Sequence, residues 1–264
     1  MKNITLKTNN KIATVTLNRP EVRNAMDEAT IAALHEAFNK VAADGGIRAL
    51  VLRGEGKAFC AGGDLNWMRQ AADYGEAENT ADAQKLGEML YALNSLNKPT
   101  IAMVHGAAFG GGVGLVSACD VALGLENSKF CLSEVKIGLI PSVISPYVLA
   151  AMGERQARRF YLTADVMTAE KAKQVGLLHE VYQTENDWQQ ALEDTLNLIL
   201  NNAPNAMADA KSQIFDLSHK AITPDVVQQT SEAIAKRRAT DEAKEGVSAF
   251  LEKRQPYWNS NWKP

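Results

Sequence analysis

The sequence predicts an α/β fold in which a core of strands and helices is followed by a helical region. Three observations support this prediction. Short apolar segments with strand character lie in the first half of the chain, and a helical apolar period dominates from Pro146 onward. The length of 264 residues is enough for one core with a helical appendage. We therefore expect a core over residues 1–200 and a helical C-terminal region over residues 201–264.

The first elements are predicted by alternation and by helix-capping residues. Residues 4–6 and 12–17 alternate apolar and polar side chains around Asn9-Asn10, which is typical of a β-hairpin. Asp27 is a good N-cap for the helix that follows, and Gly45-Gly46 should end this helix. The apolar run 47–52 then predicts the next strand.

The middle of the chain contains a polar stretch and several short strands. Residues 66–82 are polar and are expected to be mobile, with a helix from about residue 83 to 96. Further strands are expected at 100–104, 121–125 and 129–132, with a buried helix at 115–119 and a Gly- and Pro-rich loop at 134–146. The helices expected after that loop span 146–152, 154–162, 168–175, 186–202, 205–218, 224–239 and 241–251.

Composition excludes several functional classes. The net charge is −3 with both signs interspersed, and the absence of a basic block argues against nucleic acid as the main partner. The three cysteines have no metal-ligand spacing, so no metal is expected, and their pattern suits a reducing compartment. No apolar run is long enough to cross a bilayer, and the first residues do not resemble a signal peptide. We therefore expect a cytoplasmic protein that does not act at a membrane.

A cluster of glycines at 110, 111, 112 and 114 is the main functional signal. It follows an apolar strand and precedes a helix, where main-chain N–H groups could face a ligand. Tight packing of strand against helix is an equally good interpretation of the cluster alone. Ser117 breaks the dinucleotide-binding pattern, and Gly112 stands where a phosphate loop needs Lys. The remaining functional interpretation is a turn that binds a smaller oxyanion, such as a polarised carbonyl.

A second glycine turn, Gly62-Gly63, also follows a strand. One N–H from Gly63 and one from Gly111 could meet at a single carbonyl oxygen, although the two loops could equally be unrelated. Glu134 stands among apolar residues, which could raise its pKa for acid–base work. From spacing alone, a solvent-facing charge at a strand end is the preferred interpretation of Glu134.

Other candidate residues give weaker signals. The four histidines are far apart, and packing is favoured for His105 beside the glycine turn. Trp67 and Met68 could line an apolar pocket or anchor their segment. The chain has no G-x-S-x-G motif, so serine hydrolase chemistry is not supported.

Taken in order, these motifs resemble the crotonase family, also called the enoyl-CoA hydratase/isomerase family. The similarity covers nearly the whole chain and is specific as an ordered series. Its carriers are Leu17-Asn18-Arg19-Pro20 with Asn24-Ala25, Phe59-Cys60-Ala61-Gly62-Gly63-Asp64-Leu65, the segment 106–112, Cys119-Asp120, the segment 134–141, Thr163-Ala164, Ala172 and Val175-Gly176-Leu177.

The resemblance implies a crotonase-like spiral of ββα repeats with a C-terminal helical region that builds trimers, often paired into hexamers. It implies an acyl-CoA thioester substrate and no separate cofactor, since coenzyme A is part of the substrate. The thioester oxygen would be held by the N–H groups of Gly63 and Gly111. The CoA moiety would contact Val22, Arg23 and Asn24, and the segment that includes Ala61, Gly63, Asp64 and Leu65.

One position departs from the family pattern. Typical hydratases of the family carry two glutamates, which would fall at positions 114 and 134, and this chain has Gly114 and Glu134. A single carboxylate suits an isomerase that moves a proton between two carbons, because hydration also requires an activated water. A catalytically inactive acyl-CoA-binding protein is a further alternative, against which the retained Glu134 argues.

A second resemblance favours hydration. Residues 140–148, with Gly153-Glu154-Arg155 and Arg158-Arg159, resemble the subgroup that hydrates methylglutaconyl-CoA in leucine breakdown and carboxygeranoyl-CoA in terpenoid breakdown. Most of the family has a glycine-rich loop where this chain has Ser142-Val143-Ile144-Ser145. We therefore expect a hydro-lyase for a branched, carboxylated enoyl-CoA. On this hypothesis Gly114 leaves space for the carboxymethyl branch, and Glu134 handles water and proton in turn.

Overall fold

The structure of the protein is a computed structural model that describes residues 3–259. Its main sheet has six strands in the order β1-β2-β3-β4-β6-β9. All neighbouring strands run parallel except the β1–β2 hairpin. The strands are β1 (Ile4–Asn9), β2 (Ile12–Leu17), β3 (Ala49–Gly54), β4 (Thr100–Val104), β6 (Val121–Leu125) and β9 (Glu180–Tyr182).

The predicted hairpin and first helix are confirmed. Ile4 pairs with Leu17 and Asn9 pairs with Ile12 across the hairpin. Helix α1 (Glu28–Ala43) has Asp27 as its N-cap, and the Asp27 side chain accepts a hydrogen bond from the Thr30 N–H. Leu34 and Phe38 lie on the inner face of this helix and are fully buried.

The predicted helix start near residue 83 is wrong, because most of the polar stretch 66–82 is already helical, and its mobility stays a prediction. Helix α2 (Leu65–Ala71) begins where the Asp64 carboxylate accepts hydrogen bonds from Asn66 N–H and Trp67 N–H. Helix α3 (Glu76–Asn94) begins at Gly75, whose N–H donates to Glu78. The capping side chains start both helices, although the stretch lacks the apolar period from which a helix would be predicted.

The prediction that strands are confined to the first half of the chain is also wrong. A second sheet has the order β5-β7-β8, made of β5 (Ala107–Phe109), β7 (Lys129–Cys131) and β8 (Met167–Thr168). Strand β8 and strand β9, which joins the main sheet beside β6, both lie in the second half. Two- and three-residue strands are too short to show an alternating pattern.

Five further elements complete the core. Helix α4 (Gly111–Ala118) follows the glycine turn directly, and the 3₁₀ turn η2 (Glu134–Ile137) follows β7. Helices α5 (Ser145–Met152), α6 (Glu154–Thr163) and α7 (Ala169–Gln174) fall where the helical period predicted them. Most of the predicted 134–146 loop is therefore irregular, except for η2 and the first turn of α5.

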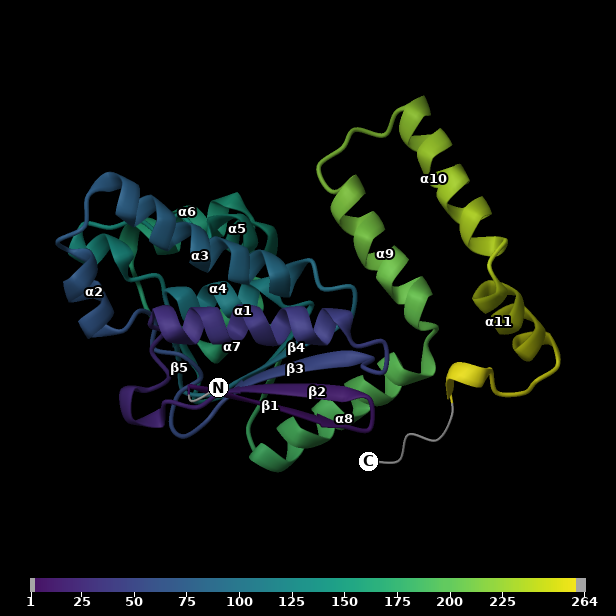
Figure 1. Ribbon diagram of the computed structural model, residues 1–264, viewed down its shortest axis with the longest axis horizontal. Coiled ribbons are helices and arrows are strands. Elements are labelled where there is room, and N and C mark those ends of the chain that lie inside the picture. The colour runs from purple at the N-terminus through teal and green to yellow at the C-terminus, as the bar shows by residue number, and fades with distance from the viewer. Residues whose placement is uncertain (1–2, 260–264) are drawn as a thin grey trace.

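Two apolar clusters lie on opposite faces of the main sheet. Figure 1 shows α1 and α3 on one side and α8 (Glu185–Asn201) on the other. The larger cluster contains residues of α1, α3 and α4, and the smaller one packs Trp188, Leu192, Leu196 and Leu200 of α8 against the sheet. This arrangement is the mixed α/β fold with helices at its C-terminal end that the sequence predicts.

The last helices lie beside this body rather than within it (Figure 1). They are α9 (Pro204–Leu217), α10 (Pro224–Arg238) and α11 (Asp241–Leu251). The Lys211 ammonium lies 2.8 Å from Asp120, and the Arg48 guanidinium donates to the Asn202 carbonyl at 2.6 Å. Helix α8 ends at Asn201 and α9 begins at Pro204, and the division of the chain into two regions near residue 200 stays a prediction. None of the helices over residues 3–259 is long and apolar enough to span a membrane.

Candidate active site

The two glycine turns lie side by side. Cys60 and Ala108 form an isolated parallel bridge between them. The Cys60 N–H donates to the Ala107 carbonyl at 3.0 Å, and the Phe109 N–H donates to the Cys60 carbonyl at 2.9 Å. The interpretation of the turns as unrelated loops is therefore wrong.

Each turn offers a main-chain N–H with no acceptor among the residues that the structure describes. Gly111 is the first residue of α4, so its N–H has no partner within the helix. Gly63 is exposed and is framed by two hydrogen bonds of Met26: the Met26 N–H donates to Gly62 O at 2.7 Å, and Met26 O accepts from the Asp64 N–H at 2.8 Å. Both amides are thus available to a carbonyl oxygen.

Glycine is required in these turns for two physical reasons. Gly110 has φ +48° and ψ −116°, and Gly62 has φ +98°, which are unfavourable for residues with a side chain. A Cβ on Gly112 would lie 2.5 Å from the Cys60 carbonyl oxygen and 3.0 Å from Cys60 Cβ. Tight packing, one of the two interpretations that the sequence left open, is confirmed at Gly112, and ligand binding by the turn stays a prediction.

Glu134 lies against the glycine turn that precedes α4. One carboxylate oxygen, Oε1, lies 3.1 Å from the position that a Cβ on Gly110 would take. The other, Oε2, is buried and has no hydrogen-bond partner among the described residues. Burial raises the pKa of the Glu134 carboxyl above its usual range. The preferred reading from spacing, a solvent-facing charge, is wrong, and the buried carboxyl suits acid–base work.

The space beside Gly114 is not free. A Cβ on Gly114 would overlap the side chain of Ile144, whose own Cβ lies 3.0 Å from that position, and would meet Leu90 Cδ1 at 3.6 Å. Gly114 and Ile144 are both buried. The expectation that Gly114 leaves room for a substrate branch is therefore wrong, because Ile144 fills the position where other family members carry a carboxylate.

The predicted CoA-binding residues divide into two groups. Val22, Arg23 and Leu65 are exposed, Ala61 is half-buried, and the Ala61 N–H donates to the Arg23 carbonyl at 3.0 Å. The structure thus brings the two predicted segments together, and their contact with CoA stays a prediction.

Asn24 and Asp64 form the second group, and their side chains have structural roles. Asn24 is 1% exposed, and its amide donates to the carbonyls of Glu55 and Ala58 at 2.8 and 2.7 Å. Asp64 is 6% exposed, caps α2 and accepts from Arg19 at 3.0 Å. These contacts show that both side chains shape the loops that carry the exposed residues, and a contact of Asn24 or Asp64 with CoA stays a prediction.

Helix α2 places two large side chains beside the Gly63 turn. Trp67 and Met68 both come within 3.6 Å of the position that a Cβ on Gly63 would take. The Trp67 indole N–H is buried and has no acceptor among the described residues. Both side chains are partly exposed, so they line one side of the turn as well as anchoring α2.

Sequence reasoning missed a pair of hydroxyl groups near Glu134. The Tyr161 hydroxyl on α6 donates to Ser145 Oγ at 3.0 Å, and Ser145 Oγ donates to the Pro141 carbonyl at 2.7 Å. The only sequence signal was the unusual segment 142–145, which gave no reason to single out Tyr161.

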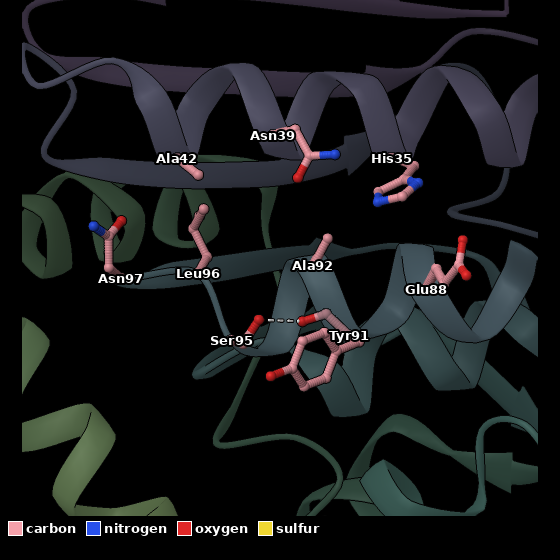
Figure 2. Close-up of a pocket in the computed structure, with 9 residues that line it drawn as sticks. All are labelled: His35, Asn39, Ala42, Glu88, Tyr91, Ala92, Ser95, Leu96 and Asn97. Atoms are coloured by element: carbon pink, nitrogen blue, oxygen red, sulfur yellow. Dashed lines mark hydrogen bonds between the residues drawn. The ribbon is translucent and has the colours of Figure 1, made fainter.

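The histidines lie outside this site. His105 Nε2 is 2.9 Å from the Gly56 carbonyl oxygen, and its ring contacts Trp188 edge-on, which confirms packing as its role. Figure 2 shows His35 on α1 facing Glu88 on α3 across an open groove of about 330 Å³. None of the predicted site residues lines this groove.

Comparisons with known proteins agree with this geometry. The family model for enoyl-CoA hydratase/isomerase matches residues 7–261. The chain is 30% identical to the 2,3-dehydroadipyl-CoA hydratase of Escherichia coli, over 97% of this chain and 98% of that protein. It is 31% identical to the crotonyl-CoA hydratase of Syntrophomonas wolfei, over 96% of each.

A solved structure gives the same result in three dimensions. The enoyl-CoA hydratase from Shewanella pealeana superposes with a TM-score of 0.94 at 40% identity, covering 97% of this chain and 96% of that one. The family model, these relatives and the shared fold therefore identify the chain as a member of the enoyl-CoA hydratase/isomerase family, the crotonases.

Proposed function

We propose that the protein is an enoyl-CoA hydratase whose substrate is a branched, carboxylated enoyl-CoA such as methylglutaconyl-CoA. The observation that carries the proposal is the placement of Glu134, whose unpaired carboxylate lies against the turn that leads into α4. A thioester oxygen between the Gly63 and Gly111 amides would place the enoyl group beside this carboxylate. All parts of the chemistry can then be assigned to groups of this chain.

The proposed reaction uses one carboxylate twice. Glu134 takes a proton from water while the water oxygen forms its bond to C3, and the electrons of the C2–C3 double bond move toward the thioester oxygen. The Gly63 and Gly111 N–H groups stabilise the negative charge on that oxygen, a contribution worth about 3 kcal/mol for each donor in comparable sites. Glu134 then returns the proton to C2, so that one water molecule is added and the carboxylate is regenerated.

The choice of substrate is supported by resemblance and by the known range of the relatives. The segment 140–148 resembles the subgroup that hydrates carboxylated, branched enoyl-CoAs. Among the relatives, the Escherichia coli protein is named for a dicarboxylic acyl group and the Syntrophomonas protein for the unbranched crotonyl group. Since Ile144 fills the space at Gly114, the branch must lie elsewhere in the site.

Isomerisation is the second candidate, and Gly114 is the observation that favours it. With no carboxylate at position 114, Glu134 could move a proton between C2 and C4 of a 3-enoyl-CoA without activating water. The two reactions share the amide pair and the carboxylate, so only turnover distinguishes them.

A substrate panel tests both candidates. Methylglutaconyl-CoA, crotonyl-CoA and a 3-enoyl-CoA are offered to the purified protein, and loss or migration of the double bond is followed by absorbance and mass. We expect hydration with the highest kcat/KM for methylglutaconyl-CoA. Rapid isomerisation of the 3-enoyl-CoA with no hydration of the other two would overturn the hydratase proposal.

A further inference from the structure

The Tyr161 hydroxyl is a second polar group near the site, and the fold determines that it donates its proton to Ser145. Tyr161 on α6, Ser145 at the start of α5 and the Pro141 carbonyl form a chain of two hydrogen bonds, 3.0 and 2.7 Å long. A carbonyl oxygen can only accept, so Ser145 must donate to Pro141 and its oxygen must accept from Tyr161. The Tyr161 oxygen therefore keeps its lone pairs free to accept a hydrogen bond from another group.

These hydrogen-bonded residues lie on helices that contact the turn of Glu134 and the helix of Gly114. Helix α6 packs against the η2 turn that begins with Glu134, and α5 packs against α4 and α6. Ser145 directly follows Ile144, the side chain that fills the space at Gly114. The negative charge of Glu134 adds to the effect of burial in raising the pKa of the Tyr161 phenol, so the phenol stays neutral.

Glu134 and Tyr161 each keep an acceptor atom that no described residue uses, and they lie on two elements, η2 and α6, that are in contact. Glu134 Oε2 is buried without a donor among the described residues, and no described residue donates to the Tyr161 oxygen. A water molecule has two protons, and hydration requires that one be transferred while the oxygen lone pair points at C3. A carboxylate that takes one proton and a phenol oxygen that binds the other would fix this orientation.

On the basis of the proposed hydratase function, we infer that Tyr161, oriented by Ser145, binds the attacking water and orients it toward C3 in a site that has no carboxylate at position 114. Glu134 alone carries the proton from water to C2. Tyr161 accepts a hydrogen bond and exchanges no proton, and Ser145 is a positioning residue.

The test separates water handling from proton transfer at C2. Hydration is measured with methylglutaconyl-CoA and crotonyl-CoA, and exchange of the C2 proton is measured with the saturated butyryl-CoA in D₂O. Exchange needs the amide pair and Glu134 but no attacking water. Tyr161→Phe keeps the ring and removes only the hydroxyl, and Ser145→Ala removes the group that fixes its direction. Tyr147→Phe is the matched control, because Tyr147 is also partly buried but takes no part in this hydrogen-bonded chain.

We expect Tyr161→Phe to lower kcat for hydration roughly 5- to 30-fold, the effect of losing one or two kcal/mol of hydrogen bonding, while exchange changes less than threefold. Ser145→Ala should cause a smaller loss of hydration, and Tyr147→Phe should leave both rates unchanged. Unchanged hydration in Tyr161→Phe would overturn the inference. Equal losses of hydration and exchange would also overturn it, since Tyr161 would then act through Glu134 or the fold.

The unchanged protein provides the check on the function itself. If it exchanges the C2 proton of butyryl-CoA but hydrates neither enoyl-CoA, the hydratase proposal fails and the inference fails with it. If it hydrates and only the Tyr161 variant behaves contrary to expectation, the hydratase proposal stands and the inference alone is wrong.

Discussion

At Glu134 the fold holds a carboxyl group where its ionised form is disfavoured. Its Oε2 atom is buried without a hydrogen-bond donor among the described residues, and burial raises its pKa. Such a group binds and releases protons closer to neutral pH than an exposed glutamate does. The cost to stability is tolerated because the same environment makes the carboxylate a better base.

The first prediction concerns the pH dependence that follows from this pKa. If Glu134 starts the reaction ionised, kcat/KM should fall as the pH drops through its raised pKa, at a pH above the ordinary glutamate value. Glu134→Gln should lower kcat by about 10²–10⁴-fold and remove that acidic limb. The pH–rate profiles of both proteins measure this, and a Gln variant with most of its activity would show that another group is the base.

Glu134→Gln should lower activity, but it is not expected to lower stability. The folded-state pKa of Glu134 lies above the unfolded value, so its contribution is fully present below the unfolded pKa and is lost as pH rises through the folded pKa. At neutral pH Glu134→Gln should therefore leave the free energy of unfolding unchanged or higher. Urea unfolding at pH 5 and pH 8 tests this, and a variant destabilised at pH 8 would contradict it.

A second residue-scale prediction concerns the pair Gly114 and Ile144. An added Cβ at Gly114 overlaps the Ile144 side chain, so Gly114→Ala should lower the free energy of unfolding by about 1–3 kcal/mol despite the better helix propensity of alanine. Ile144→Leu removes the branch at Cβ at similar volume. In that background Gly114→Ala should cost less, and a double-mutant cycle measures the difference. Equal costs in both backgrounds would show that Ile144 does not fill the space.

Among single residues, predictability from sequence depended on backbone chemistry. Gly62, Gly110 and Gly112 could be recognised because residues with a side chain rarely adopt the conformations of the first two, and a Cβ at Gly112 would overlap Cys60. Glu134 was identified, but its burial was not, because spacing does not show which side of a turn a side chain faces. Tyr161 and Ser145 lie 16 positions apart on two helices, and only their packing brings the hydroxyls together.

At the scale of elements, helix boundaries were predictable where side chains cap them. Asp27 and the glycines that follow α1 marked both of its ends. Helix α2 was missed because its cap, Asp64, was assigned to substrate binding and the helix has no buried face. Strands β8 and β9 were missed because their pairing partners, β7 and β6, lie about 40 and 60 residues earlier in the chain.

The cap of α2 leads to the third prediction. Asp64 accepts N–H bonds from Asn66 and Trp67 and pairs with Arg19, and α2 carries Trp67 and Met68 beside Gly63. Asp64→Ala should lower the free energy of unfolding by about 1–2 kcal/mol and raise KM for acyl-CoA through the displaced α2. Asp64→Asn keeps a capping oxygen and serves as the matched control, with a smaller loss.

The Asp64 carboxyl should also affect how the free energy of unfolding depends on pH in acid. Burial alone would raise the pKa of its carboxyl, but the hydrogen bonds from Asn66, Trp67 and Arg19 outweigh burial and lower it. A lowered folded-state pKa gives stability that is present above the unfolded pKa and is lost as pH falls through the folded pKa. Unfolding free energies between pH 3 and pH 6 should therefore depend less on pH in both Asp64 variants than in the unchanged protein.

At the scale of the whole molecule, both the division of the chain near residue 200 and the role of the helices beyond it stay predictions. Helices α9 to α11 lie beside the core and expose many large apolar side chains. Ile222, Phe250 and Leu251 are 91%, 82% and 72% exposed. So much exposed apolar surface is typical of a surface that binds another protein chain.

We therefore predict that this surface forms the contact between copies of the chain in a trimer or a pair of trimers. The double substitution Phe250→Asp and Leu251→Asp would bury unpaired charges at such a contact, so it should shift the protein to monomers in sedimentation at micromolar concentration. Leu162→Asp is the matched control. Leu162 is 79% exposed on α6, which precedes the C-terminal helices α9 to α11. An unchanged oligomer in the double variant, or dissociation only in the Leu162 variant, would place the contact on the core instead.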